Sequence, residues 1–376
     1  MFERAALCVK EGRMPYGYYQ LKQTLKSFFR SVFLRMTRPF YQIEFALSYW
    51  NYKRRMKKRP GDSLPPAVDL VFVLKKKAPG WILEGICEEI ARYFKGRTAM
   101  HYVEDSPSLP RAKAYFFSHY SFFSKCFRRT PDIWGSKSLV WFPHPKESGR
   151  SERERLIFAL NRSTKTVCPC SANTQILASQ GLQKNKLTYV LGGADPELFK
   201  PHERGLGAVG FCTAYYPRKA PDLMFEIIGF MPHRRFILLG PDSADPANRH
   251  RKWDRYGRFN ELLSFKNLTY VEAPYAEYPK YYAQMDVLVS TSRLEGGPIP
   301  LIEALMCNIV PVASKTGFAA DIIRHGENGF LFQVDSAPQV VVDLIERAYE
   351  LKTDVRKTAE HLSWENFSLQ IQGLLN

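Results

Sequence analysis

The chain has 376 residues, of which 45% are hydrophobic and 24% charged, and its formal net charge is +17 at pH 7. This composition excludes an intrinsically disordered chain, and the length suits two domains of ordinary size. The charge is uneven. Residues 1–66 hold 14 Lys and Arg against four Asp and Glu, a net +10, which leaves +7 for the remainder. A basic N-terminal extension is therefore predicted.

The seven cysteines are scattered, odd in number and mostly set in apolar runs. With no signal peptide expected ahead of them, this pattern favours a reduced, cytoplasmic compartment. Cys168 and Cys170 form a close pair, but no second Cys or His pair stands at zinc-finger spacing. We therefore expect no metal site there.

Residues 16–58 alternate aromatic and leucine side chains with Lys and Arg. The apolar positions recur at helical spacing, and Pro39 is expected to break or kink the helix. No apolar run reaches 18 residues, so a transmembrane helix is not expected. A basic segment with Trp and Tyr is typical of a helix on an anionic membrane surface, and we predict this role for residues 1–60. A helical hairpin packed on the body is the alternative. Nucleic-acid binding is not expected, because no reader motif accompanies the charge.

Beyond a linker at residues 61–67, strands and helices alternate. The apolar run Val68–Leu74 is typical of a buried parallel strand, and a helix is predicted at residues 81–94. Further strands are predicted near residues 112–118, 138–143, 165–171, 187–190, 207–215, 235–241, 268–274, 286–292, 309–314 and 328–333. Later helices are predicted near residues 172–182, 220–231, 278–285, 300–307, 318–326 and 337–351. The fold class predicted is α/β, with two Rossmann-like doubly wound domains in tandem and a basic helical N-terminal extension. Ligands of such sheets bind at the carboxyl ends of strands, here in the cleft between domains.

One loop, in the stretch Leu294–Glu303 with the sequence "LEGGPIPLIE", joins a predicted strand to a predicted helix. Gly296 and Gly297 let the backbone approach a ligand, and Pro298 and Pro300 suit the first helical turn. Such a helix start attracts an anion, for which a diphosphate is the natural candidate. The N–H groups expected to face it are those of Gly297, Ile299 and Leu301.

Two carboxylates bracket this loop. Glu295 can accept hydrogen bonds from sugar hydroxyls, and Glu303 from the vicinal hydroxyls of a ribose. A ligand with a sugar, a diphosphate and a ribose is a nucleotide sugar. The alternative is that Glu295 caps the helix and Glu303 is a solvated residue.

The stretch "EGGPIPLIE", with its Glu-x7-Glu spacing, and the following "ALMCNIVPVASKTGFAADIIRHGENGFLF" resemble retaining glycosyltransferases of the GT-B fold, specifically family 4 (glycosyl transferases group 1). The resemblance covers Gly207–Phe367 and weakens back to Val68. It implies sugar transfer from a nucleotide sugar to an acceptor hydroxyl. The basic N-terminal segment then suggests a glycan or polyprenyl-linked acceptor at the membrane, in cell-surface polysaccharide synthesis. Because no Asp-x-Asp occurs, no cofactor and no metal are expected.

The resemblance also implies site residues. Lys219 matches a family lysine that neutralises the diphosphate, whereas Ala214 stands where the family often has arginine, and Arg218 is a candidate substitute. The implied catalytic residues are Glu295, His144 and Lys219. The implied donor-binding residues are Gly80, Arg218, Lys219, Glu295, Gly296, Gly297, Pro298, Ile299 and Glu303. Candidates on the acceptor side are His119 and Lys77.

These patterns predict an extension at residues 1–66, an acceptor-side domain at 67–203, a donor-binding domain at 204–361 and a terminal helix at 362–376 that packs back on the first domain. The protein is expected to be cytoplasmic and peripheral on the inner face of the membrane. Two other functions stay open. One is epimerisation or phosphorolysis of the same nucleotide sugar. The other is non-catalytic binding, which Ala214 and the reduced glycine loop favour.

Overall fold

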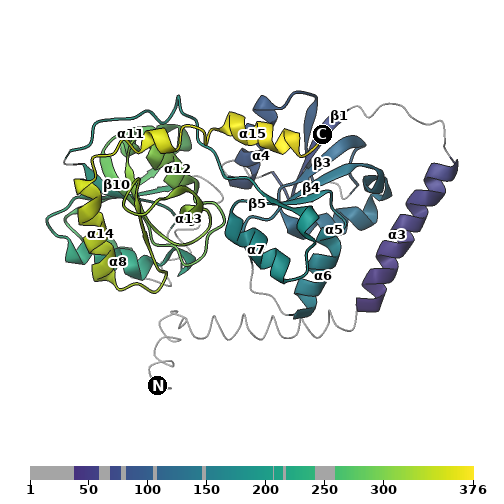
Figure 1. The fold of residues 1–376 in the computed structure, drawn as a ribbon, viewed down its shortest axis with the longest axis horizontal. Coiled ribbons are helices and arrows are strands. Elements are labelled where there is room, and N and C mark those ends of the chain that lie inside the picture. The colour runs from purple at the N-terminus through teal and green to yellow at the C-terminus, as the bar shows by residue number, and fades with distance from the viewer. Residues whose placement is uncertain are drawn as a thin grey trace, which may run out of the picture. The chain divides into compact units, whose positions relative to one another are not determined.

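The computed structural model describes residues 38–376 except 59–67, 78–81, 105–107, 146–149, 206, 215–216 and 242–258. The described residues divide into two compact units, drawn in Figure 1. The first unit extends to Val190 and includes the C-terminal segment Phe367–Asn376, and the second is Leu191–Asn366. The domain limits given above stay predictions.

The first unit is built on a parallel sheet in the order β2-β1-β3-β4-β5-β6. Strand β1, Val68–Leu74, lies second in this order and is buried throughout Leu70–Leu74, as expected for an apolar run in a parallel sheet. The strands are β1 Val68–Leu74, β2 Thr98–Tyr102, β3 Ala112–Phe117, β4 Lys137–Trp141, β5 Lys165–Cys168 and β6 Leu187–Tyr189. The helices are α3 Arg38–Lys58, α4 Ile82–Tyr93, α5 Tyr120–Arg129, α6 Arg150–Leu160 and α7 Ser171–Ser179.

The second unit repeats this plan with a parallel sheet in the order β12-β11-β10-β7-β8-β9. Its strands are β7 Ala208–Cys212, β8 Phe236–Pro241, β9 Leu268–Ala273, β10 Met285–Ser290, β11 Val310–Ser314 and β12 Phe330–Phe332. Its helices are α8 Pro221–Phe230, α10 Phe259–Leu263, α11 Tyr278–Tyr282, α12 Ile299–Met306, α13 Ala319–Ile322, α14 Pro338–Glu350 and the first turn of α15 Trp364–Gly373. The prediction of two doubly wound α/β domains is confirmed.

Helix α3 covers part of the first unit with one face. Its Phe45 and Ser48 are buried, and the Trp134 indole N–H donates to the Ser48 hydroxyl at 3.2 Å. Pro39 lies in the first turn of α3, where a missing N–H costs nothing. The residues before Arg38 lie outside the described part of the chain, so the predicted break at Pro39 stays a prediction. No helix in the described part of the chain combines the length and apolarity needed to cross a membrane.

The C-terminal segment packs on the first unit. Lys137 Nζ donates to the carbonyls of Leu375 at 2.6 Å and Asn376 at 2.8 Å. The Ser368 hydroxyl donates to the carbonyl of Ile90 at 2.9 Å. These hydrogen bonds attach the C-terminal segment to β4 and α4 of the first unit.

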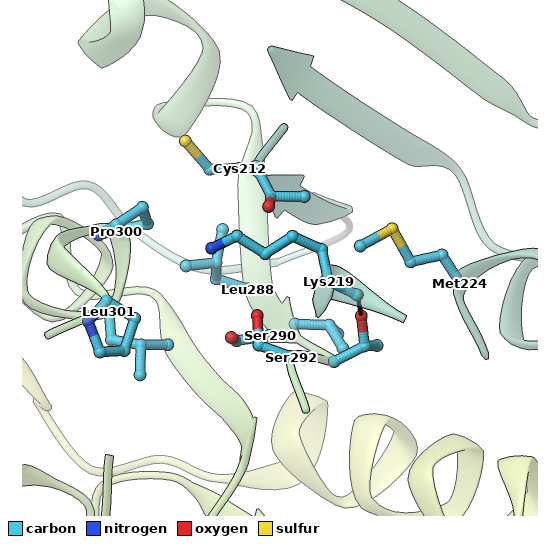
Figure 2. Close-up of a pocket in the computed structure, with 12 residues that line it drawn as sticks. Cys212, Lys219, Met224, Leu288, Ser290, Ser292, Pro300 and Leu301 are labelled. Carbon is cyan, nitrogen blue, oxygen red and sulfur yellow. Dashed lines mark hydrogen bonds between the residues drawn. The ribbon is translucent and has the colours of Figure 1, made fainter. Parts of the chain in front are cut away.

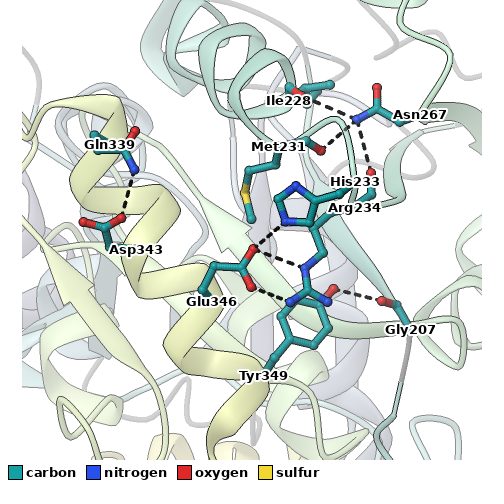
Figure 3. Close-up of polar contacts among 10 residues, drawn as sticks. All are labelled: Gly207, Ile228, Met231, His233, Arg234, Asn267, Gln339, Asp343, Glu346 and Tyr349. Carbon is teal, nitrogen blue, oxygen red and sulfur yellow. Dashed lines mark hydrogen bonds and ion pairs between the residues drawn. The ribbon is translucent and has the colours of Figure 1, made fainter.

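A polar cluster fixes the amino-terminal edge of the second unit's sheet (Figure 3). Arg234, which precedes β8, donates to the Glu346 carboxylate at 3.2 Å and stacks on the Tyr349 ring at 3.8 Å. The Tyr349 hydroxyl in turn donates to the carbonyl of Gly207 at 2.8 Å, just before β7. Helix α14 is thereby joined to two neighbouring strands, which leaves the opposite, carboxyl edge of the sheet for a ligand.

Candidate functional site

The strand order of the second unit reverses at β7. The chain builds outward through β8 and β9, and then returns to place β10 on the other side of β7. Doubly wound sheets bind ligands outside the carboxyl ends of the two strands at such a reversal. The candidate site therefore lies beyond Cys212 and Ser290.

A cavity of about 20 Å³ occupies this position (Figure 2). It has room for about one water molecule and is too small for a diphosphate. The Lys219 side chain extends across it, between Met224 and Pro300. Its other lining residues are Cys212, Thr213, Leu288, Val289, Ser290, Thr291, Ser292, Pro298 and Leu301.

Two backbone anchors hold the Lys219 turn against the loop after β10. The Thr291 hydroxyl donates to the Lys219 carbonyl at 2.6 Å, and the Arg293 N–H donates to the Arg218 carbonyl at 2.8 Å. The next residue, Ala220, has φ 50° and ψ 59°, a left-handed conformation that is strained for any residue with a Cβ. Such strain persists where the surroundings impose it, and it is frequent at functional sites.

The turn brings Lys219 to Glu295, 76 residues later in the chain, and the two side chains form an ion pair. Glu295 is only 7% exposed, and its Oε1 also accepts from the Ser292 hydroxyl at 2.6 Å. Arg218 Nη1 lies 4.0 Å from Glu295 Oε2. A buried carboxylate therefore holds a cation in place at the carboxyl edge of the sheet. Glu295 does not cap α12, whose N-cap is Pro298 with no side-chain hydrogen bond.

Glu295 makes stability depend on pH. Burial acts to raise the pKa of its carboxyl, but Lys219, Arg218 and the Ser292 hydroxyl outweigh burial and hold that pKa below its ordinary value. A lowered folded-state pKa stabilises the fold above the unfolded-state pKa, about 4.3, and that stability is lost as the pH falls through the folded-state value. We expect Glu295→Gln to lower the free energy of unfolding at pH 7 by about 3 kcal/mol.

Urea unfolding of the wild type and Glu295→Gln across pH 3–7 measures this effect. The difference between the two proteins should shrink as the pH falls below about 4.3. A difference that stays constant or grows on acidification would contradict the ion pair as described.

Glu303 is enclosed more completely. It is 2% exposed, and its two oxygens accept from two tyrosine hydroxyls, Tyr275 to Oε1 at 2.7 Å and Tyr282 to Oε2 at 2.6 Å. Burial raises the pKa of this carboxyl although both hydroxyls act to lower it. The interpretation of Glu303 as a solvated residue is therefore wrong. Sequence reasoning did not predict that these tyrosines pair with Glu303, because 28 and 21 residues separate them from it along the chain.

The predicted set of open N–H groups needs correction. The Ile299 N–H donates to the Gly297 carbonyl at 2.9 Å, and the Leu301 N–H donates to the Pro298 carbonyl at 2.9 Å. These two N–H groups already donate to carbonyl oxygens within the turn that leads into α12, so they are not open to an anion in this structure. The positive groups described beside the Glu295 carboxylate are the side chains of Lys219 and Arg218.

Residues 261–363 match the family model "Glycosyl transferases group 1". The predicted resemblance to the group 1 glycosyl transferases is confirmed. The matched segment contains Glu295 and Glu303 but begins after Lys219, so the lysine is placed at the site by geometry alone.

One curated relative is an uncharacterized glycosyltransferase, MJ1178, of Methanocaldococcus jannaschii. It is 23% identical over 223 residues, which are 55% of this chain. The match spans 58% of that relative's length.

Solved structures share the fold at low sequence identity. HepE of Anabaena, in complex with UDP-glucose, has a TM-score of 0.65 at 13% identity, with 82% of this chain and 99% of that chain covered. Sucrose-phosphate synthase of Thermosynechococcus elongatus also has a TM-score of 0.65, at 14% identity and 81% and 98% coverage. The two-domain Rossmann-like arrangement predicted as GT-B is thus confirmed, whereas assignment to family 4 in particular stays a prediction.

The other site residues that the family resemblance implies lie in the first unit. His119 is the N-cap of α5, and its Nδ1 accepts from the Ser121 N–H at 3.1 Å, so it has a structural task of its own. His144 follows β4, with its Nδ1 3.0 Å from the Pro145 carbonyl oxygen. Lys77 is exposed beyond β1. Gly80 lies outside the described residues. Their roles toward donor or acceptor stay predictions.

The described cysteines show neither a reactive thiol nor a disulfide at this site. Burial raises the pKa of the Cys212 thiol in the cavity wall, so it is a neutral lining group. Cys168 and Cys170 are buried and unbridged. Within the ranges that the structure describes, no three His, Cys, Asp or Glu side chains are grouped to hold a metal ion.

Proposed function

We propose that this protein transfers a sugar from a nucleoside diphosphate sugar to a hydroxyl of a glycan or polyprenyl-linked acceptor, with retention at the anomeric carbon, in cell-surface polysaccharide synthesis. The observation that carries the proposal is the Lys219–Glu295 pair at the carboxyl edge of the second sheet, in which Glu295 belongs to the segment that matches the group 1 glycosyl transferases. The UDP-glucose complex of HepE supports a nucleotide-sugar donor.

The reaction makes the leaving group more negative, and a preplaced cation stabilises that charge. The bond from the anomeric carbon to the diphosphate oxygen breaks, and the acceptor oxygen bonds to the same face of that carbon. The acceptor proton passes to the departing phosphate oxygen. In this proposal the diphosphate takes the place of the Glu295 carboxylate beside the Lys219 ammonium, so donor binding separates the ion pair. Glu295 is then available to sugar hydroxyls.

Glu295 acts in this proposal as a binding group and not as a covalent nucleophile. The Ser292 hydroxyl donates to its Oε1 at 2.6 Å, and this hydrogen bond can orient the carboxylate when Lys219 has turned to the diphosphate. We also propose that Lys219 and Arg218 replace a divalent metal in neutralising the diphosphate. Transfer that persists in EDTA would support this part, and transfer that requires added Mg²⁺ or Mn²⁺ would contradict it.

We further propose that α3 brings the protein to an anionic membrane surface, where a lipid-linked acceptor would be found. With Phe45 and Ser48 turned to the body, the helix leaves Ile43, Leu47 and Trp50 more than half exposed. Cations accompany this apolar stripe, with the Arg54 guanidinium 5.4 Å from the Trp50 ring. Exposed apolar side chains beside basic ones are typical of interfacial helices.

We expect Leu47→Glu/Trp50→Glu to weaken binding to phosphatidylglycerol vesicles at least roughly tenfold, because each lost side chain contributes about 1.5–3 kcal/mol when buried. Co-sedimentation with the vesicles measures it. Phe230→Glu/Val340→Glu is the matched control, since it adds the same charge at exposed apolar positions on α8 and α14. Equal binding by both double variants would contradict the role of α3.

A panel of nucleotide sugars tests the proposed function. At least one donor should raise the melting temperature of the wild type and yield a labelled glycoside with the donor's anomeric configuration. Epimerised donor or a free sugar phosphate would identify the rival reactions. Stabilisation without any product would support non-catalytic binding, and the absence of both would overturn the proposal.

A further inference from the structure

Each oxygen of the Glu303 carboxylate already accepts a hydrogen bond from a hydroxyl group of the protein itself. Tyr275 donates to one oxygen at 2.7 Å and Tyr282 to the other at 2.6 Å. A buried carboxylate without such donors is costly, and two hydroxyls at one carboxylate match what a vicinal diol offers. The arrangement therefore reproduces, with side chains, the hydrogen bonds that a ribose would make.

The two tyrosines differ in their surroundings. Tyr282 is fully buried in α11, with its ring 5.3 Å from the Phe199 ring. Tyr275 lies in a short 3₁₀ turn, Tyr275–Glu277, after the carboxyl end of β9, and it is 48% exposed. Tyr282 is thus a fixed partner of Glu303. Tyr275 also has its ring 5.9 Å from the Phe199 ring, but its other side faces solvent, so it can turn outward at the cost of this contact with the core.

We infer that Tyr275 is a displaceable occupant of the ribose position on Glu303: its hydroxyl satisfies Oε1 until a nucleotide binds, and the ribose then takes its place. This inference rests on the proposed function. The Tyr275 hydroxyl competes with the ribose for Glu303 Oε1. The wild type should therefore bind its donor less tightly than a protein without this hydroxyl. Opening the site costs a hydrogen bond, and the ribose restores it.

Removing the competitor should tighten binding. In Tyr275→Phe, Oε1 lacks its partner in the free protein and gains one in the complex, so we expect the dissociation constant of the nucleotide to fall by about tenfold. The free protein should melt at a lower temperature and recover more on nucleotide addition than the wild type does. Tyr282→Phe is the matched control. It leaves Oε2 without this hydroxyl in both states, so it should lower the melting temperature without tightening binding.

The experiment is a calorimetric titration of the full chain and both variants with UDP, GDP and ADP, followed by the 2′,3′-dideoxy form of the diphosphate that binds the wild type best. Tightening in Tyr275→Phe for the ribonucleotide, and not for its dideoxy form, is the expected result. Unchanged or weaker binding of the ribonucleotide, or equal tightening for the dideoxy form, would overturn the inference alone. Failure of every diphosphate to bind any of the proteins would overturn the proposed function, and this inference with it.

Discussion

Lys219→Met should lower turnover by at least roughly 10²–10³-fold, the cost typical of removing one group that stabilises charge in a transition state. The lysine is 16% exposed and paired with a buried carboxylate, so its charge is held in position before the substrate arrives. The same substitution leaves Glu295 buried without this partner, and we expect the free energy of unfolding to fall by about 3 kcal/mol. Turnover by product formation and urea unfolding measure the two effects.

A second variant separates the two effects. Lys219→Met/Glu295→Gln removes both charges, so it should regain much of the lost stability and none of the turnover. Lys352→Met, at an exposed lysine of the same unit, controls for the loss of a positive charge. Recovery of activity in the double variant would show that Lys219 matters for folding and not for chemistry.

Gly317→Ala should lower kcat/KM by roughly 10²-fold, the effect of a displacement of about 1 Å at a reacting centre. Gly317 has φ +55°, and a Cβ built on it would lie 2.5 Å from the carbonyl oxygen of Gly296 and 3.0 Å from the Cβ of Glu295. The clash is with backbone, so the loop that carries Glu295 must move. Kinetics with the best donor from the panel, together with a melting curve, measures the result.

Gly326→Ala is the matched control for this prediction. Gly326 has φ +84° but no atom within 4 Å of an added Cβ. Both alanine variants should lose about 1–2 kcal/mol of stability through the left-handed backbone. A large loss of activity is expected in Gly317→Ala alone. Equal activity in the two variants would show that the Glu295 loop tolerates displacement.

The sheets were predictable because their strands are runs of buried apolar residues, as at Val68–Leu74. β2 escaped prediction because each residue of Thr98–Tyr102 is only partly buried and its polar and apolar residues do not alternate clearly. Helix α5 was not predicted, because its aromatic residues continue the apolar character of the preceding strand. Pro39 lies in the first turn of α3, a position that suits proline.

The site was predictable from residue types and not from contacts. Glycines and two glutamates at a fixed spacing indicated a donor loop, and Lys219 was found by resemblance. Nothing in the sequence shows that Lys219 and Glu295 pair, because 76 residues separate them and only the adjacency of β7 and β10 joins them. The strained Ala220 was also invisible, since alanine gives no signal of positive φ.

The most direct test of the central claim is a crystal structure of the full chain with the nucleoside diphosphate that binds best. The account predicts that the Lys219–Glu295 pair separates, with a phosphate oxygen about 2.7–3.2 Å from Lys219 Nζ and the ribose hydroxyls on Glu303. A nucleotide bound elsewhere, with the Lys219–Glu295 pair intact, would contradict it.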